Sequence, residues 1–124
     1  MDEIKRCLDT YALMEIYLGN EKFAGYLNVE FVINDLTLAE FYGVLLREYG
    51  EGEAELWFKK LERYSVQVNN KILIEAVKFR HTNKKQNISF FDAVGYIFSL
   101  NNRYLFVTGD KEFEKFANVE FKKK

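Results

Sequence analysis

Short apolar runs alternate along this chain with longer segments in which apolar residues recur at helical spacing. The short runs predict five strands, at residues 4–8, 31–33, 66–68, 104–107 and 119–121. The helical spacing predicts main helices at residues 10–18, 38–49, 53–63, 72–77 and 90–100, with short helical pieces near 21–25 and 111–116. This alternation is typical of βαβ units. The sequence therefore predicts an α/β fold, a three-layer sandwich with a mainly parallel central sheet of about five strands.

The polarity of the strands predicts their order in the sheet. Residues 104–107 are all apolar, as in a strand that is covered on both faces. Residues 65–68 and 119–122 alternate between apolar and polar, as half-covered edge strands do. The order 3-2-1-4-5 satisfies both patterns and places the first and fourth strands side by side at the centre. Because Lys5 and Arg6 fit a central position poorly, we expect only the last three residues of the first strand to be buried.

Composition narrows the class of protein. A chain of 124 residues with 48% hydrophobic and 17% aromatic residues predicts one ordered domain over residues 1–124. The formal net charge of -1 argues against non-specific coating of nucleic acid, although a bound cation could still attract a polyanion locally. Cys7 is the single cysteine, which excludes an internal disulfide and a cysteine zinc cluster. The charged opening and the lack of a long apolar run favour a cytoplasmic location.

Four carboxylates fall where such a fold can bring them together: Asp9, Glu40, Asp92 and Asp110. Asp9 ends the first apolar run and Asp110 ends the fourth, so both are expected at the carboxyl edge of the sheet, where open α/β sheets bind ligands. Four carboxylates in one crevice raise one another's pKa. A divalent cation removes this conflict, and oxygen ligands suit Mg²⁺ or Mn²⁺. The pattern therefore predicts a metal site.

Each acid also has a simpler structural explanation. Glu40 and Asp92 stand three residues after Thr37 and Ser89, which is the spacing of a capping box at the start of a helix. The acid after the fourth strand could cap the next helix, and the acid after the first strand could end a turn. Asp92 favours the metal site, because its predicted helix is apolar on most sides and an isolated carboxylate there is costly to desolvate.

Four motifs hold these acids, in this order: Leu8-Asp9-Thr10, Thr37-Leu38-Ala39-Glu40, Phe91-Asp92-Ala93-Val94-Gly95-Tyr96 and Val107-Thr108-Gly109-Asp110-Lys111-Glu112-Phe113-Glu114. With them the chain resembles PIN domains, specifically the small VapC-like toxin ribonucleases, over nearly all of its length. The resemblance implies a magnesium- or manganese-dependent endoribonuclease with the four acids as catalytic and metal-binding residues. It also implies supporting hydroxyls at Thr10 and Thr108, a homodimer, and an antitoxin that holds the toxin inactive.

Substrate-binding residues stay unassigned. Two groups of basic residues could form a rim around the acids. The first is Arg47, Lys59, Lys60 and Arg63, and the second is Arg80, Lys84 and Lys85. The simpler expectation is that these residues lie on solvated helix faces. Residues 122–124, all lysine, are expected to form a frayed, solvated tail. His81, the single histidine, is expected at the surface.

Other classes of function stay open beside the nuclease toxin. The same fold could serve as an RNA- or protein-binding module without catalysis, or as an RNA-processing nuclease that is not a toxin. A receiver-type phosphoacceptor domain also gathers acids at strand ends, but it would leave Glu40 and Asp92 without a role. The presence of all four acids favours the nuclease. The RNA that is cut and the number of metal ions are not readable from the pattern.

Overall fold

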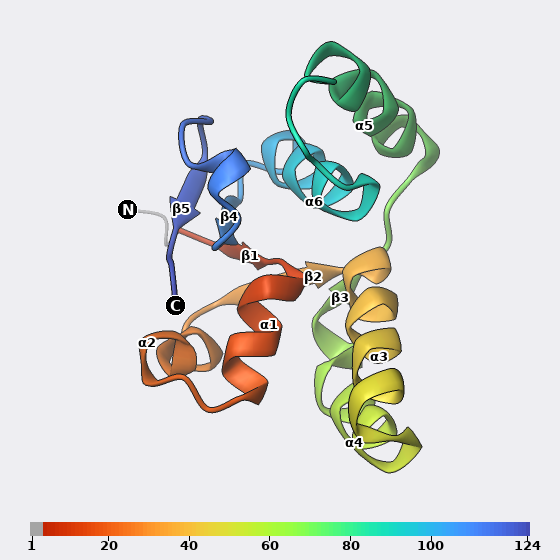
Figure 1. The fold of residues 1–124 in the computed structure, drawn as a ribbon, viewed down its shortest axis with the longest axis vertical. Coiled ribbons are helices and arrows are strands. Elements are labelled where there is room, and N and C mark those ends of the chain that lie inside the picture. The colour runs from red at the N-terminus through yellow and green to blue at the C-terminus, as the bar shows by residue number, and fades with distance from the viewer. Residues whose placement is uncertain (1–3) are drawn as a thin grey trace.

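The computed structural model describes residues 4–124 and shows a parallel sheet with helices on both faces (Figure 1). The strands, in the spatial order β3-β2-β1-β4-β5, are β1 (Arg6–Leu8), β2 (Phe31–Asn34), β3 (Ser65–Val66), β4 (Leu105–Thr108) and β5 (Val119–Phe121). The α-helices are α1 (Thr10–Tyr17), α2 (Glu21–Ala24), α3 (Asp35–Tyr49), α4 (Glu51–Leu61), α5 (Asn70–Thr82) and α6 (Phe90–Asn101). The 3₁₀ turns are η1 (Gly25–Asn28), η2 (Glu62–Tyr64) and η3 (Lys111–Phe113). The predicted fold class and strand order are confirmed.

Two apolar cores lie on the two faces of the sheet, because successive side chains of a strand point to opposite faces. One residue of each central strand packs into the core of α1, α3 and α4, and its neighbour packs into the core of α5 and α6. These pairs are Leu8 and Cys7, Ile33 and Val32, and Val107 and Phe106. Figure 1 shows the two layers, with α5 and α6 above the sheet and α1 to α4 below it. The buried strands explain why their sequences are continuously apolar.

The start of α3 differs from the prediction. Asn34, the last residue of β2, caps the helix: its side-chain oxygen accepts a hydrogen bond from the Thr37 backbone N–H at 2.8 Å. Thr37 therefore lies inside the first turn, and the predicted capping box of Thr37 and Glu40 is wrong. Asn34 competes well for this role because a short side-chain acceptor directly after a strand reaches the free N–H groups of the first turn. The observed bounds of α4 and β3 differ slightly from the predicted ones. The short helix predicted near residues 111–116 is a single 3₁₀ turn, η3.

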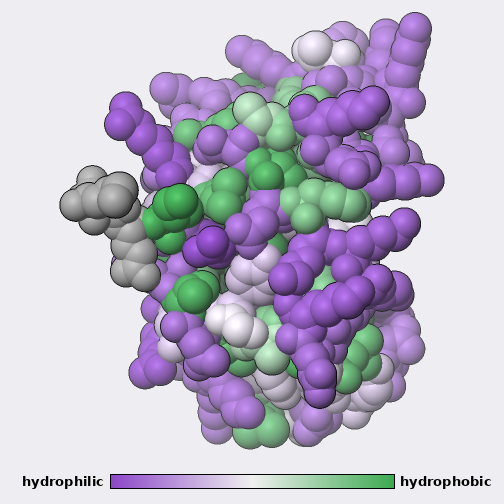
Figure 2. Space-filling view, turned by 90° about the vertical axis from the view of Figure 1, so that its left-hand side faces the viewer, coloured by the Kyte–Doolittle hydropathy of each residue, from purple (hydrophilic) through white to green (hydrophobic). Residues whose placement is uncertain are grey.

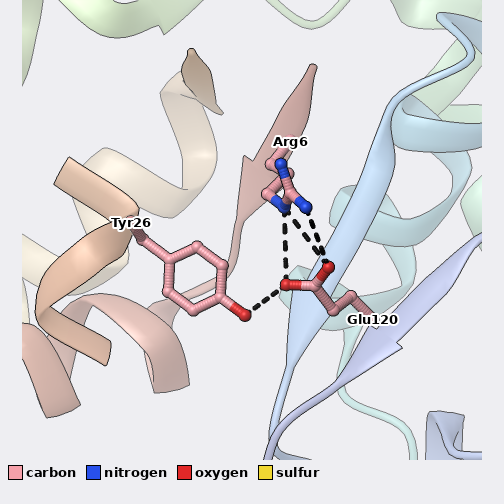
Figure 3. Close-up of polar contacts among 3 residues, drawn as sticks. All are labelled: Arg6, Tyr26 and Glu120. Carbon is pink, nitrogen blue, oxygen red and sulfur yellow. Dashed lines mark hydrogen bonds and ion pairs between the residues drawn. The ribbon is translucent and has the colours of Figure 1, made fainter. Parts of the chain in front are cut away.

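Arg6 explains how a charged residue fits a central strand. Its guanidinium reaches over β4 to Glu120 on β5, with an Nη2 to Oε1 distance of 3.2 Å (Figure 3). The Tyr26 hydroxyl of η1 donates a hydrogen bond to the other carboxylate oxygen. The Arg6 and Glu120 side chains are 25% and 29% exposed, so this cluster is sheltered from water. It ties the edge strand β5 to β1 and to the segment that covers them.

We expect Glu120→Gln to lower the free energy of unfolding by about 1–2 kcal/mol, because it leaves the half-buried Arg6 without its counter-charge. Glu48→Gln is the matched control. Glu48 pairs with Arg47 at a similar distance, 3.3 Å, but both side chains are more than half exposed. Its loss is expected to change stability by less than about 0.5 kcal/mol. Urea unfolding of both variants tests this, and equal effects would contradict a structural role for the cluster.

Several smaller expectations can be compared with the structure. His81 is exposed, as predicted, and Cys7 is buried. Among the described residues, no helix is both long enough and apolar enough to cross a membrane. The expectation of a cytoplasmic location rests partly on the charged residues among positions 1–3, which lie outside the described residues.

Candidate functional site

Two of the predicted acids follow the central strands at the carboxyl edge of the sheet. Asp9 comes directly after β1 and caps α1, with Oδ1 accepting a hydrogen bond from the Ala12 N–H at 2.8 Å. Asp110 lies two residues after β4 and caps η3 through the Glu112 N–H at 3.0 Å. Because β1 and β4 are parallel neighbours, both acids leave the sheet at the same edge. The predicted cap at Asp110 is confirmed, and Asp9 is a helix cap as well.

Two threonine hydroxyls connect three of the acids. Thr108, the last residue of β4, accepts a hydrogen bond from the Asp110 N–H at 3.0 Å, and its side chain is hydrogen-bonded to the Asp9 carboxyl group. Thr10, the first residue of α1, donates its hydroxyl hydrogen to the Glu40 carboxylate on α3. Both residues thus lie beside the acids. They fix carboxylates that come from separate elements relative to one another.

The fourth acid lies on the other face of the sheet. Ser89 caps α6, and its Oγ accepts a hydrogen bond from the Asp92 N–H at 3.1 Å, so the predicted capping position is right here. The helices α3 and α6 contact each other, which brings Glu40 toward Asp92. All four acids line one open pocket of about 440 Å³. The other lining residues are Thr10, Tyr11, Gly109, Lys111 and Lys123.

The electrostatics of the pocket reflect this crowding. The pKa of Asp9 is raised to about 8, mainly by burial and also by the negative charges of Asp92 and Glu40, against hydrogen bonds that lower it. The pKa of Asp92 is raised to about 6, mainly by burial and also by repulsion from Glu40 and Asp110. The mutual repulsion that the sequence predicted is therefore present. The crowded carboxylates in this pocket therefore favour either protonation or the binding of a cation.

The same residues can be compared with the needs of a metal ion. Carboxylates and hydroxyls are the oxygen donors that Mg²⁺ and Mn²⁺ prefer, so the chemistry of the donor set fits. Within residues 4–124, however, no group of three or more His, Cys, Asp and Glu side chains is arranged so that it could hold a metal ion. The metal site therefore stays a prediction.

Four residues of the pocket were not assigned to it from the sequence: Tyr11, Gly109, Lys111 and Lys123. Gly109 and Lys111 belong to the motif around Asp110, and Tyr11 follows Thr10, so closeness in sequence could have indicated these three. Lys123 carries no such signal. It reaches the pocket only because the chain continues from β5 past the end of β4.

Gly109 makes room for Tyr11. A Cβ atom at position 109 would overlap the Tyr11 ring, which lies against the glycine backbone. We expect Gly109→Ala to lower the free energy of unfolding by about 1–3 kcal/mol, because the ring must move out of its place. Gly43→Ala is the control: it lies inside α3 with nothing near the added methyl group, and it should stabilise the protein by about 0.5–1 kcal/mol. Thermal or urea unfolding gives both values, and a stabilising Gly109→Ala would contradict this account.

The profile of the PIN domain family matches residues 6–119, so the chain belongs to the PIN domain family. The VapC20 toxin of Mycobacterium tuberculosis has a TM-score of 0.74 and 15% identity, with 92% of this chain and 98% of that chain covered. A toxin–antitoxin complex from Klebsiella pneumoniae has a TM-score of 0.74 and 17% identity, with 93% and 95% covered. VapBC2 from Rickettsia felis has a TM-score of 0.75 and 15% identity, with 98% and 99% covered.

At these identities the structural likeness shows a shared fold. A comparison with curated proteins gave no match. Membership of the PIN domain family confirms the family that the motifs indicated. It also makes the receiver-type alternative wrong.

Proposed function

We propose that this protein is a magnesium- or manganese-dependent endoribonuclease and the toxin of a toxin–antitoxin pair. The observation that carries the proposal is the pocket itself: acids from four separate elements line it at the carboxyl edge of a PIN domain sheet. A protein without catalysis would have no need for this costly concentration of charge, which raises the pKa of Asp9 and Asp92. The pocket is also open to solvent, as a site for a polymer must be.

In this proposal Asp9 and Asp110 hold the principal ion, because both are fixed at the ends of rigid central strands. Asp92 joins them from α6, and Glu40 either binds the ion or acts as a base. When bound, such an ion would make water more acidic and would offset the charge that develops on the phosphoryl oxygens. Thr108 orients Asp9, and Thr10 orients Glu40, through the hydrogen bonds described above.

The nature of the substrate and partner rests on the family and on its solved members. The VapC20 structure is described as that of a toxin that cleaves the sarcin–ricin loop, and the other two structures are toxin–antitoxin assemblies. We therefore propose RNA as the substrate, an antitoxin protein as the partner, and a homodimer as the assembly.

The direct test incubates the purified protein with defined RNAs, with and without Mg²⁺ or Mn²⁺, and maps the cleaved ends. We expect internal cleavage that needs the metal and is lost with a chelator. Manganese calorimetry that shows no binding, together with intact RNA, would favour a binding module. Cleavage without arrest of growth on expression would favour a processing nuclease.

A further inference from the structure

Residues 122–124 continue from β5 along the wall of the acid pocket. The Lys122 N–H donates a hydrogen bond to the Thr108 carbonyl oxygen at 2.8 Å, which extends the pairing of β5 with β4. The Lys124 N–H donates to the Tyr11 hydroxyl oxygen at 3.2 Å. Lys123, between these two anchors, lines the pocket. The prediction of a frayed tail is therefore wrong, because the backbone on both sides of Lys123 has a partner. The predicted exposure to solvent is confirmed for Lys123 and Lys124.

The side chains of Lys122 and Lys123 lie in different pockets. The Lys122 ammonium lies over the Tyr26 ring, 5.6 Å from its centroid, beside Glu120 in a separate pocket. Lys123 lines the acid pocket together with Lys111. The two side chains therefore line different pockets. The side of the molecule that carries β5 and α2 shows mainly hydrophilic side chains, with apolar patches between them (Figure 2).

Among the described residues, neither pocket lysine forms an ion pair with an acid. Within residues 4–124 the ion pairs are Lys5–Glu30, Arg6–Glu120 and Arg47–Glu48. Lys111 and Lys123 thus line a pocket with four carboxylates without pairing with any of them, and their ammonium groups are available to an anion. A polyanion that approaches this pocket meets repulsion from the acids, which nearby cations reduce.

We propose that Lys123, assisted by Lys111, binds a backbone phosphate of the RNA strand beside the phosphodiester to be cut. This inference rests on the proposed function. A lysine is suited to the task because its ammonium group is a compact charge that neutralises a phosphate and displaces a counterion. Such a contact positions the strand and carries no base specificity.

Binding of a labelled single-stranded RNA to the full chain tests the proposal, with Asp9→Asn in every protein to prevent cleavage. We expect Lys123→Gln to weaken binding about tenfold at low salt, and to reduce the slope of log K against log salt by about 0.7. Lys123→Arg should restore most of the affinity. The matched control, Lys122→Gln, removes the same charge one residue away and should change affinity less than twofold.

Equal losses for Lys122→Gln and Lys123→Gln, or no RNA binding at all, would overturn the proposal. A second measurement separates this failure from failure of the proposed function. In the protein with Asp9 intact, Lys123→Gln should raise KM with little change in kcat. If the Lys123→Gln variant cleaves RNA with an unchanged KM, the nuclease function is supported and the proposed role of Lys123 is contradicted. If the protein with Asp9 and Lys123 intact does not cleave RNA, the proposed nuclease function is contradicted. The binding comparison then still tests whether Lys123 contacts RNA.

Discussion

Asp9→Asn is expected to reduce metal-dependent RNA cleavage about a thousandfold or more, while the folded protein becomes as stable as before or more stable. Asn keeps the size of the side chain and its acceptor for the Ala12 N–H, but it removes the negative charge that a cation would need. The same change removes a carboxylate that burial and its neighbours disfavour. Lost activity with retained stability separates a functional acid from a structural one.

Asp92→Asn should behave in the same way, because Asp92 lies in the same pocket and its pKa is also raised. Glu62→Gln serves as the control, since this acid is exposed in η2 and does not line the pocket. Cleavage rates and thermal unfolding are measured for all three variants. Full activity in either pocket variant would contradict the proposed catalytic role.

The strand order was predictable because its physical cause is local in the sequence. A strand covered on both faces must be apolar throughout, and residues 104–107 meet that condition. Parallel pairing then places residues after β1 and β4 at one edge, which is why Asp9 and Asp110 could be brought together from the sequence. Asp92 was informative for a related reason: an acid at the start of an apolar helix requires a partner.

Other features depend on contacts that no sequence window contains. The cap of α3 required knowing that β2 ends at Asn34, three residues before Thr37, the expected cap. Arg6 looked misplaced because its partner, Glu120, is more than one hundred residues away. The place of Lys123 at the pocket was not predicted, because only the pairing of β5 with β4 carries this exposed residue there.

The metal-free protein is expected to lose stability as the pH rises from about 4 to about 8. Asp9 and Asp92 have pKa values of about 8 and about 6 in the folded state, against 3.8 for an ordinary aspartate. The folded state therefore holds protons that the unfolded state has already released, and the free energy of unfolding falls across this range. Below about pH 4 both states are protonated, and this contribution to stability is fully present.

A bound cation should reverse this loss where the carboxylates are ionised. At pH 8, Mn²⁺ or Mg²⁺ at one hundred times its Kd should raise Tm by about 10 °C, whereas at pH 5 protons compete with the metal and the rise should be small. Asp9→Asn should flatten the pH dependence of the metal-free protein and remove most of the rise at pH 8. Thermal unfolding at both pH values, with metal or with a chelator, measures these changes. A metal effect that is equal at pH 5 and pH 8, or unchanged by Asp9→Asn, would show that the cation binds elsewhere, because only the crowded acids link proton release to metal binding.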